Sequence, residues 1–247
     1  MAKPWTTLDV VETEEGRLEL RQRDTDDFLI VIDGRVLMSS RAHRSEVEVA
    51  SLACERLASP RRARILIGGL GMGYTLRAAL DGLPEDAEVH VAELNEVVVR
   101  WCRGPLASLT DDALRDPRVR VRHGDVSKII RGTPANGRWS AIILDLYEGP
   151  HQTSTDPGDA FYGRGALSST RAALVDGGVF SVWSEERDRS FEGRLKRAGF
   201  QFDHIRSGRG GRRHPVYIAT ASPDASRASQ GGGNGSSPLR RGARRRR

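Results

Sequence analysis

The sequence predicts an α/β protein with a doubly wound, mostly parallel sheet, preceded by a small antiparallel β region. Three observations carry this prediction. Residues 16–40 contain short β-like runs around an Asp33-Gly34 turn. From Arg64 onward, strand-like and helix-like segments alternate, which is typical of a parallel sheet. A glycine-rich loop, Gly68 to Gly73, follows the first of these strands and opens a helix.

Local periodicity defines the N-terminal elements. Residues 17–21 alternate polar and apolar side chains, and residues 28–32 are continuously apolar. Asp33-Gly34 is a strong hairpin signal before the run 35–38. A mostly apolar helical face then recurs over residues 45–58. We therefore expect a small antiparallel sheet, joined by a helix to the rest of the chain.

The alternating zone predicts five parallel strands with helices between them. The expected strands are residues 64–67, 88–92, 119–122, 141–144 and 178–182. The expected helices are residues 75–80, 96–102, 126–130 and 165–174. After a further helix at 191–198, residues 199–201 and 216–220 are expected to supply two closing strands. Strand, helix and strand at this spacing form a doubly wound sheet.

The net charge lies at the C-terminal end. The 247 residues carry a formal net charge of +6, and residues 222–247 contain seven arginines and one acid, so residues 1–221 are neutral on balance. The segment is rich in Ser and Gly with almost no apolar residue, which predicts a disordered tail. It either contacts a polyanion such as RNA or DNA, or is a solvated extension. We expect a β region (1–44), an α/β core (45–221) and a basic tail (222–247).

Several classes of protein are excluded by what the sequence lacks. The longest apolar runs are strand-sized, which excludes a membrane span. Residues 1–15 lack a basic stretch followed by an apolar segment, so we expect no secretory signal and a cytoplasmic location. Cys54 and Cys102 have no CxxC spacing, and we expect buried, inert thiols. The six histidines have no metal-like spacing, and no metal is expected.

Chemistry is expected at the carboxyl ends of the strands, where an open α/β sheet forms its crevice. Gly69, Gly71 and Gly73 let the backbone turn sharply and let a ligand approach amides at a helix N-terminus. Glu93 ends the second strand, where an acid either grips the two hydroxyls of a ribose or is a surface residue beside a helix start. Asp125 follows the third strand, where it either accepts a hydrogen bond from an adenine amino group or caps the next helix.

Two acids follow the fourth strand. Asp145 stands at the end of an apolar run where an acid has no role in the core, which favours a catalytic function. Glu148 directly precedes a polar loop, residues 149–161, that could act as a lid. Together the two acids form a negative mouth suited to a cationic amine, and one of them could accept its proton. The alternative for Glu148 is that it only solvates the loop.

These features, in this order, resemble the polyamine aminopropyltransferases, typified by spermidine synthase. The resemblance covers about residues 18–186. It implies a class I S-adenosylmethionine-methyltransferase-like (Rossmann-like) fold behind an N-terminal β domain, and an oligomer that we expect to be a homodimer. It also implies aminopropyl transfer from the co-substrate decarboxylated S-adenosylmethionine to a polyamine-type amine acceptor. By this resemblance Glu93 holds the ribose, Asp125 the adenine, and Asp145 orients and deprotonates the amine.

The site departs from the family pattern at two of these places. The family's loop usually reads Gly-Gly-Gly-Asp-Gly, and Gly71 occupies the position of the Asp that helps to hold the cationic donor chain. The paired acids are commonly Asp-x-x-Asp-Pro, whereas this chain has Asp145 and the longer Glu148, followed by Gly149.

Two alternative functions remain open. An S-adenosylmethionine-dependent methyltransferase on the same scaffold is favoured by Gly71, because losing an acid relieves repulsion with the carboxylate of that donor. A nucleoside-binding protein without catalysis is favoured by the substituted amine pocket. There the family has a Tyr and a Gln or His ahead of a Glu, and this chain has Glu46 and Val47 ahead of Glu48.

Overall fold

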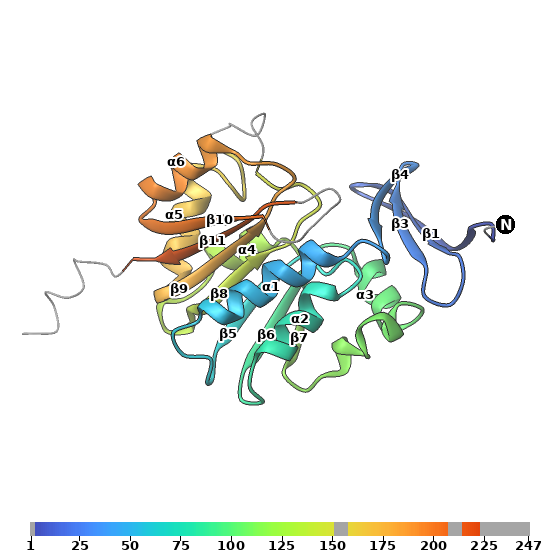
Figure 1. Ribbon diagram of the computed structural model, residues 1–247, viewed down its shortest axis with the longest axis horizontal. Coiled ribbons are helices and arrows are strands. Elements are labelled where there is room, and N and C mark those ends of the chain that lie inside the picture. The colour runs from blue at the N-terminus through green and yellow to red at the C-terminus, as the bar shows by residue number, and fades with distance from the viewer. Residues whose placement is uncertain (1–2, 151–157, 207–213, 223–247) are drawn as a thin grey trace, which may run out of the picture.

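The protein contains two β-sheets and six α-helices in a computed structural model that describes residues 3–150, 158–206 and 214–222 (Figure 1). The first sheet is antiparallel, with the order β1-β2-β3-β4. Its strands are β1 (Thr6–Thr13), β2 (Gly16–Gln22), β3 (Phe28–Ile32) and β4 (Arg35–Ser39). Asp33 and Gly34 both have positive φ between β3 and β4, as a tight hairpin requires, which confirms the predicted turn.

The second sheet has seven strands in the order β10-β11-β9-β8-β5-β6-β7. Its strands are β5 (Arg64–Gly68), β6 (Glu88–Glu93), β7 (Val119–His123), β8 (Trp139–Leu144), β9 (Leu174–Trp183), β10 (Phe200–Ile205) and β11 (Val216–Ala221). The first five are parallel, and β11 pairs antiparallel with β9 and β10. Because β5 lies between β6 and β8, the strand order reverses there, and the crevice opens at the carboxyl end of β5.

Helices cover both faces of this sheet, as predicted. They are α1 (Arg44–Arg56), α2 (Tyr74–Gly82), α3 (Glu96–Arg103), α4 (Val126–Arg131), α5 (Arg164–Ala173) and α6 (Arg189–Arg197). Ile65 and Ile67 of β5 belong to one core with α1, α2 and α3, whereas Leu66 belongs to a second core with α4, α5 and α6. Successive strand residues point to opposite faces, so a strand buried on both faces must be continuously apolar.

The small sheet packs at the end of the molecule where α3 lies (Figure 1). Its inward-facing residues, including Leu20 and Phe28, join the same core as α1, α2 and α3. The hairpin of β1 and β2 also reaches α3 through polar contacts. The indole Nε1 of Trp101 donates to Asp9 Oδ2 at 2.8 Å, which anchors the hairpin beside the carboxyl ends of the central strands.

Strand β1 was not predicted. Its apolar residues Leu8 and Val10 are 42% and 40% exposed, and Val11 is half-buried against the core, so the strand shows no continuous buried stripe that a sequence pattern could reveal. The strand exists because its backbone pairs with β2 from Thr6 to Thr13. The expected burial of Cys54 and Cys102 is confirmed, and burial raises the pKa of Cys54 to about 11 and that of Cys102 to about 12.

Division of the chain at residues 44 and 221 stays a prediction, and residues 223–247 of the basic tail lie outside the described residues. In the described part of the chain, no helix combines the length and apolar character needed to cross a bilayer. Within the same residues, no cluster of three or more His, Cys, Asp or Glu side chains is placed to hold a metal ion.

Candidate active site at the carboxyl ends of the strands

The glycine loop connects β5 to α2 through three residues in the left-handed region. Gly69, Gly71 and Gly73 have φ values of +89°, +53° and +88°. A Cβ at Gly69 would overlap the carbonyl oxygen of Asp145, so the loop and the chain after β8 can approach this closely only with glycine there. Gly73 is the N-cap of α2 and has no side chain to cap the helix, which leaves amides free for a ligand.

Glu93 lies at the end of β6 and is 7% exposed. Its Oε2 accepts a hydrogen bond from the Leu70 amide at 2.9 Å, and its Oε1 accepts one from the Asn95 amide at 2.8 Å. Burial raises the pKa of Glu93, and these two amides oppose the rise. Glu93 therefore ties the glycine loop to β6. Each carboxylate oxygen retains acceptor capacity, so a ribose hydroxyl could still bind.

Asp125 caps helix α4. Its Oδ1 accepts from the Ser127 amide at 2.7 Å and its Oδ2 from the Ser127 hydroxyl at 2.9 Å. The cap that the sequence offered as one alternative is therefore present. Contact with an adenine amino group stays a prediction, since capping does not exhaust the lone pairs of the carboxylate.

Asp145 follows the last residue of β8, and its amide donates to the Gly68 carbonyl at 3.0 Å. The residue is partly exposed, but its carboxyl group is enclosed, with Oδ2 hydrogen-bonded to the hydroxyl of Thr75 on α2. Burial and, to a lesser degree, the charge of Glu46 raise the pKa of Asp145 to about 7, against the opposing effect of the Thr75 hydrogen bond. Asp145 can therefore exchange a proton near neutral pH.

Glu46 is a site residue that the sequence analysis did not select. It lies in the first turn of α1, is 9% exposed, and accepts a hydrogen bond from the Ser45 hydroxyl at 2.7 Å. Glu46, and not Glu48, is the acid of α1 whose charge acts on Asp145. The sequence does contain a signal for its burial, because Glu46 lies on the same face of the helix as Val49, Ala50 and Ala53.

Glu148 is exposed, and its backbone carbonyl accepts a hydrogen bond from the Tyr162 hydroxyl at 3.0 Å. Tyr162 is 3% exposed, and burial raises its pKa. This bond joins the two ends of the polar loop that follows β8. The central residues of that loop, 151–157, lie outside the described residues, so the lid remains a prediction.

Met38 of β4 lies over the glycine loop. An ideal Cβ at Gly71 would lie 2.5 Å from Met38 Sδ and 2.7 Å from its Cε. The N-terminal sheet therefore places a thioether where the aminopropyltransferase pattern has a carboxylate. The side chain of Met38 on β4 thus occupies space that a side chain at position 71 would need.

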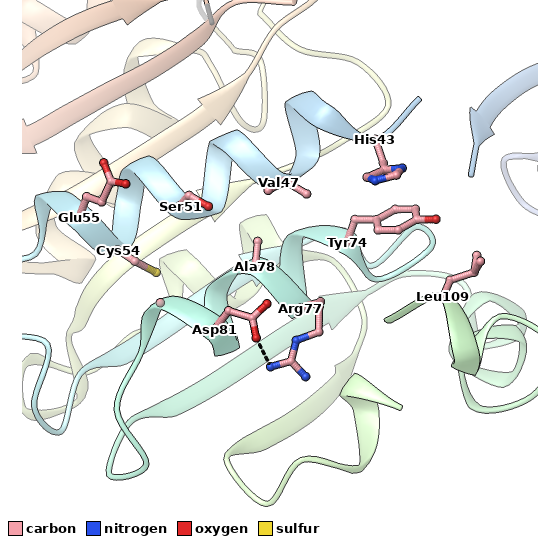
Figure 2. A pocket seen from close by; sticks show the side chains of 11 residues that line it. His43, Val47, Ser51, Cys54, Glu55, Tyr74, Arg77, Ala78, Asp81 and Leu109 are labelled. Carbon is pink, nitrogen blue, oxygen red and sulfur yellow. Dashed lines mark hydrogen bonds and ion pairs between the residues drawn. The ribbon is translucent and has the colours of Figure 1, made fainter. Parts of the chain in front are cut away.

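A cavity of about 670 Å³ lies between the β1–β2 hairpin and the carboxyl ends of β6 and β7. Leu94, Asn95 and His123 line it, directly after Glu93 and before Asp125. Another cavity, of about 510 Å³, lies between α1 and α2 (Figure 2). There the ring of His43, which precedes α1, stacks on the ring of Tyr74 at the start of α2, with centroids 4.0 Å apart. The cavity of about 670 Å³ is therefore the one that adjoins Glu93 and Asp125, the residues predicted to bind the nucleoside.

Solved structures share this architecture. Spermidine synthase from Thermotoga maritima has a TM-score of 0.65 at 18% identity, over 88% of this chain and 74% of that chain. A spermidine synthase in complex with the transition state analogue AdoDATO has a TM-score of 0.65 at 16% identity, over 88% and 73%. A probable spermidine synthase from Corynebacterium glutamicum has 0.62 at 19% identity, over 87% and 79%. The fold therefore defines a class I methyltransferase-like α/β protein with an N-terminal β-sheet.

Curated relatives narrow this class. No protein-family model matches the chain. Proteins named polyamine aminopropyltransferase are 28% identical over 134 residues in Clostridium tetani, 31% over 137 in Shewanella oneidensis and 28% over 172 in Thermococcus onnurineus. These matches cover 51%, 50% and 68% of this chain, and 42%, 23% and 56% of the relatives' own length. The chain is therefore similar to polyamine aminopropyltransferases over half to two thirds of its own length, and spans less than two thirds of the length of these relatives.

Proposed function

We propose that the protein transfers an aminopropyl group from decarboxylated S-adenosylmethionine to a polyamine-type amine acceptor. The observation that carries this proposal is Asp145, a carboxylic acid beside the glycine loop whose pKa is raised to about 7. A general base works best when its pKa lies near the operating pH. The names of the curated relatives and the AdoDATO complex of a structural neighbour support the same reaction.

The donor nucleoside would bind across the carboxyl ends of β5, β6 and β7. The Gly71 amide and the first amides of α2 would face the donor, because the Gly69 and Gly73 amides already donate to the carbonyls of Ala92 and Leu70. Glu93 would accept the ribose hydroxyls, and Asp125 would accept the adenine amino group. Both carboxylates are already oriented by backbone amides, so little ordering is needed on binding.

The reaction needs alignment and removal of one proton. The acceptor nitrogen attacks the carbon next to the sulfonium sulfur, the carbon–sulfur bond breaks, and methylthioadenosine leaves with the electron pair. The proton of the attacking amine passes to Asp145. A sulfonium is an activated leaving group, so holding the amine in line supplies most of the remaining rate. Glu148, at the mouth of the site, would attract the cationic acceptor.

A second candidate is methyl transfer from S-adenosylmethionine. The observation that favours it is the pairing of Gly71 with Met38, because no carboxylate from the loop would repel the carboxylate of that donor. The remainder of the nucleoside site would serve both donors equally.

Ligand-induced stabilisation of the purified protein tests these alternatives. A ligand that binds only the folded state raises the melting temperature in a concentration-dependent way. Stabilisation by methylthioadenosine above that by S-adenosylhomocysteine supports aminopropyl transfer, which is then assayed with decarboxylated donor and a series of diamines by mass spectrometry of the product. The reverse preference favours methyl transfer. No stabilisation by either ligand contradicts both activities.

Assembly and location belong to the same proposal. We expect a homodimer in the cytoplasm, with the arginine-rich tail making at most a weak contact with a polyanion. Light scattering on the full chain measures the first point. Salt-dependent retention on heparin, compared with a chain that ends at Ser222, measures the last.

A further inference from the structure

Thr75 occupies a position between two acceptors. Its hydroxyl lies 3.1 Å from the backbone carbonyl oxygen of Glu46 and is hydrogen-bonded to Oδ2 of Asp145. The side chain is on the first turn of α2 and is 2% exposed, so water does not replace these partners. A threonine hydroxyl has one hydrogen to donate and two lone pairs to accept with. The hydroxyl can therefore donate to only one of the two oxygens, the Glu46 carbonyl oxygen or Asp145 Oδ2, and which one it is depends on the ionisation state of Asp145.

When Asp145 carries a proton, its carboxyl can donate to Thr75 while Thr75 donates to Glu46, and every group has a partner. When Asp145 is ionised, Thr75 rotates its hydrogen to the carboxylate, and the Glu46 carbonyl loses this donor. Thr75 thus bonds to Asp145 in both states. Polar groups this deeply buried are costly to leave unpaired, so a hydroxyl that fits both states makes both accessible.

The charges around Asp145 favour the protonated state while the site is empty. Glu46 acts on it from α1 with a negative charge. Tyr162, from the segment before α5, adds no charge, because its phenol pKa is raised and its hydroxyl donates to the Glu148 carbonyl. Among the described residues, neither Glu46 nor Asp145 forms an ion pair with Lys, Arg or His. The negative charge of Glu46, with no cation paired to either acid, therefore disfavours ionisation of Asp145.

We propose that the cluster of Glu46, Thr75 and Asp145 holds one proton in the resting protein and releases it to solvent when a sulfonium nucleoside binds. The positive sulfur would supply the missing cation beside the loop, where Gly69 contacts the Asp145 backbone. Asp145 would then be a carboxylate when the acceptor amine arrives. Thr75 is the positioning residue, because its hydroxyl stays bonded to Asp145 through the change. The identity of the ligand rests on the proposed function.

Isothermal titration calorimetry tests the release. At pH 7, decarboxylated S-adenosylmethionine is titrated into the full chain in two buffers of different ionisation enthalpy. We expect release of about half a proton per site at pH 7, falling to about a tenth at pH 8, where the resting Asp145 is already mostly ionised. Methylthioadenosine, which lacks the sulfonium charge, is the matched control and should release none. Binding of the sulfonium ligand without proton release, or equal release with both ligands, overturns the proposal. S-adenosylmethionine is the sulfonium probe if only that donor binds.

A titration without ligand tests the resting state and does not depend on activity. The carboxyl carbon of Asp145 is followed by NMR on the protein labelled at aspartate, and is assigned by its absence in Asp145→Asn. We expect a midpoint near neutral pH in the wild type and a fall of at least about one pH unit in Glu46→Gln. Glu55→Gln, an exposed acid of the same helix, is the control and should leave it unchanged.

Variants at Thr75 complete the test. Thr75→Val keeps the shape but removes a hydrogen bond to the ionised form, so the midpoint should rise by about one unit, and Thr75→Ser should restore it. A wild-type midpoint near 4, or no change in Glu46→Gln, overturns the proposal even if donor binding is normal. Conversely, a neutral midpoint with no donor binding upholds the proton-holding cluster and refutes the proposed function.

Discussion

Asp145 illustrates how position changes the chemistry of a single residue. An exposed aspartate is ionised at neutral pH, whereas this one is enclosed near the start of α2 with a second acid nearby. The pKa of about 7 lets the same group hold and release a proton under working conditions.

Asp145→Asn tests the proton acceptor. The amide keeps the size of the side chain but cannot take a proton from the amine, so we expect kcat for aminopropyl transfer to fall by at least about 100-fold. The dissociation constant of methylthioadenosine should change by no more than about twofold, because the nucleoside residues are untouched. Turnover at the wild-type rate would remove Asp145 from the mechanism.

The same variant should alter how stability depends on pH. The folded-state pKa of about 7 lies above the ordinary value of 3.8, so as pH rises the unfolded chain loses this proton first. The wild type therefore loses stability between about pH 4 and pH 7, and the loss is complete above pH 7. Asp145→Asn should be the more stable protein at pH 8, by up to about 4 kcal/mol, and equal to the wild type near pH 4. Urea unfolding at both pH values measures this, with the exposed Glu85→Gln as control.

Glu93→Gln tests the ribose contact. The amide keeps one acceptor oxygen but presents an NH₂ group either to the Leu70 or to the Asn95 amide, and it weakens any bond to a ribose hydroxyl. Loss of charge-assisted hydrogen bonds predicts binding of methylthioadenosine about 10- to 100-fold weaker by calorimetry. Glu85→Gln, an exposed acid that does not line this cavity, should bind normally. Equal affinities for the two variants would assign Glu93 a structural role alone.

Among the secondary-structure elements, the glycine loop connects β5 to α2 and packs closely against the chain that follows β8. Three residues with positive φ let it turn within a few positions, and the absence of a capping side chain leaves the α2 amides available. Glu93 holds the loop from β6, and Met38 covers it from β4. Elements from both sheets therefore determine the shape of the candidate donor site.

Gly69→Ala tests the close contact between the glycine loop and the Asp145 carbonyl. The new methyl group would overlap the Asp145 carbonyl and would force a left-handed conformation on alanine, so the free energy of unfolding should fall by about 2 kcal/mol or more. Gly165→Ala is the matched control, because that glycine is in α5 with open space around it, and alanine there should stabilise by up to about 1 kcal/mol. Equal effects of the two substitutions in chemical denaturation would contradict the close approach.

At the scale of the whole molecule, the two sheets share one hydrophobic core. Residues of β2 and β3 pack in the same cluster as β5, α1 and α2, and the hairpin is anchored to α3 by Asp9 and Trp101. The candidate active site lies where the two sheets meet. The C-terminal tail contributes the net charge of the chain and almost no apolar surface.

Removal of residues 223–247 tests the independence of this core. Ser222 is retained because its amide donates to the Gly199 carbonyl and closes the last strand pair. The removed segment brings little apolar area, so the melting temperature should stay within about 2 °C of the full chain. Differential scanning calorimetry measures the shift. A drop of several degrees would show that the tail packs on the core.

The sequence by itself determined the order and type of the central elements. Apolar runs, helical spacing and the glycine loop are local signals, and Glu93, Asp125 and Asp145 follow strands whose ends must meet in a parallel sheet. Each of these expectations depends on residues close together in the chain. That is why strands such as β8 were found within a residue or two of their bounds.

Only the tertiary structure decided what faces the site. Strand β1 pairs through its backbone and buries no stripe, so no periodicity marks it. Glu46 acts on Asp145, and Met38 covers Gly71, although these residues are far apart in sequence. Such contacts depend on how α1 and the N-terminal sheet pack against the core, and packing between distant segments leaves no local pattern. The raised pKa of Asp145 has the same origin, since burial and a neighbouring charge exist only once the chain has folded.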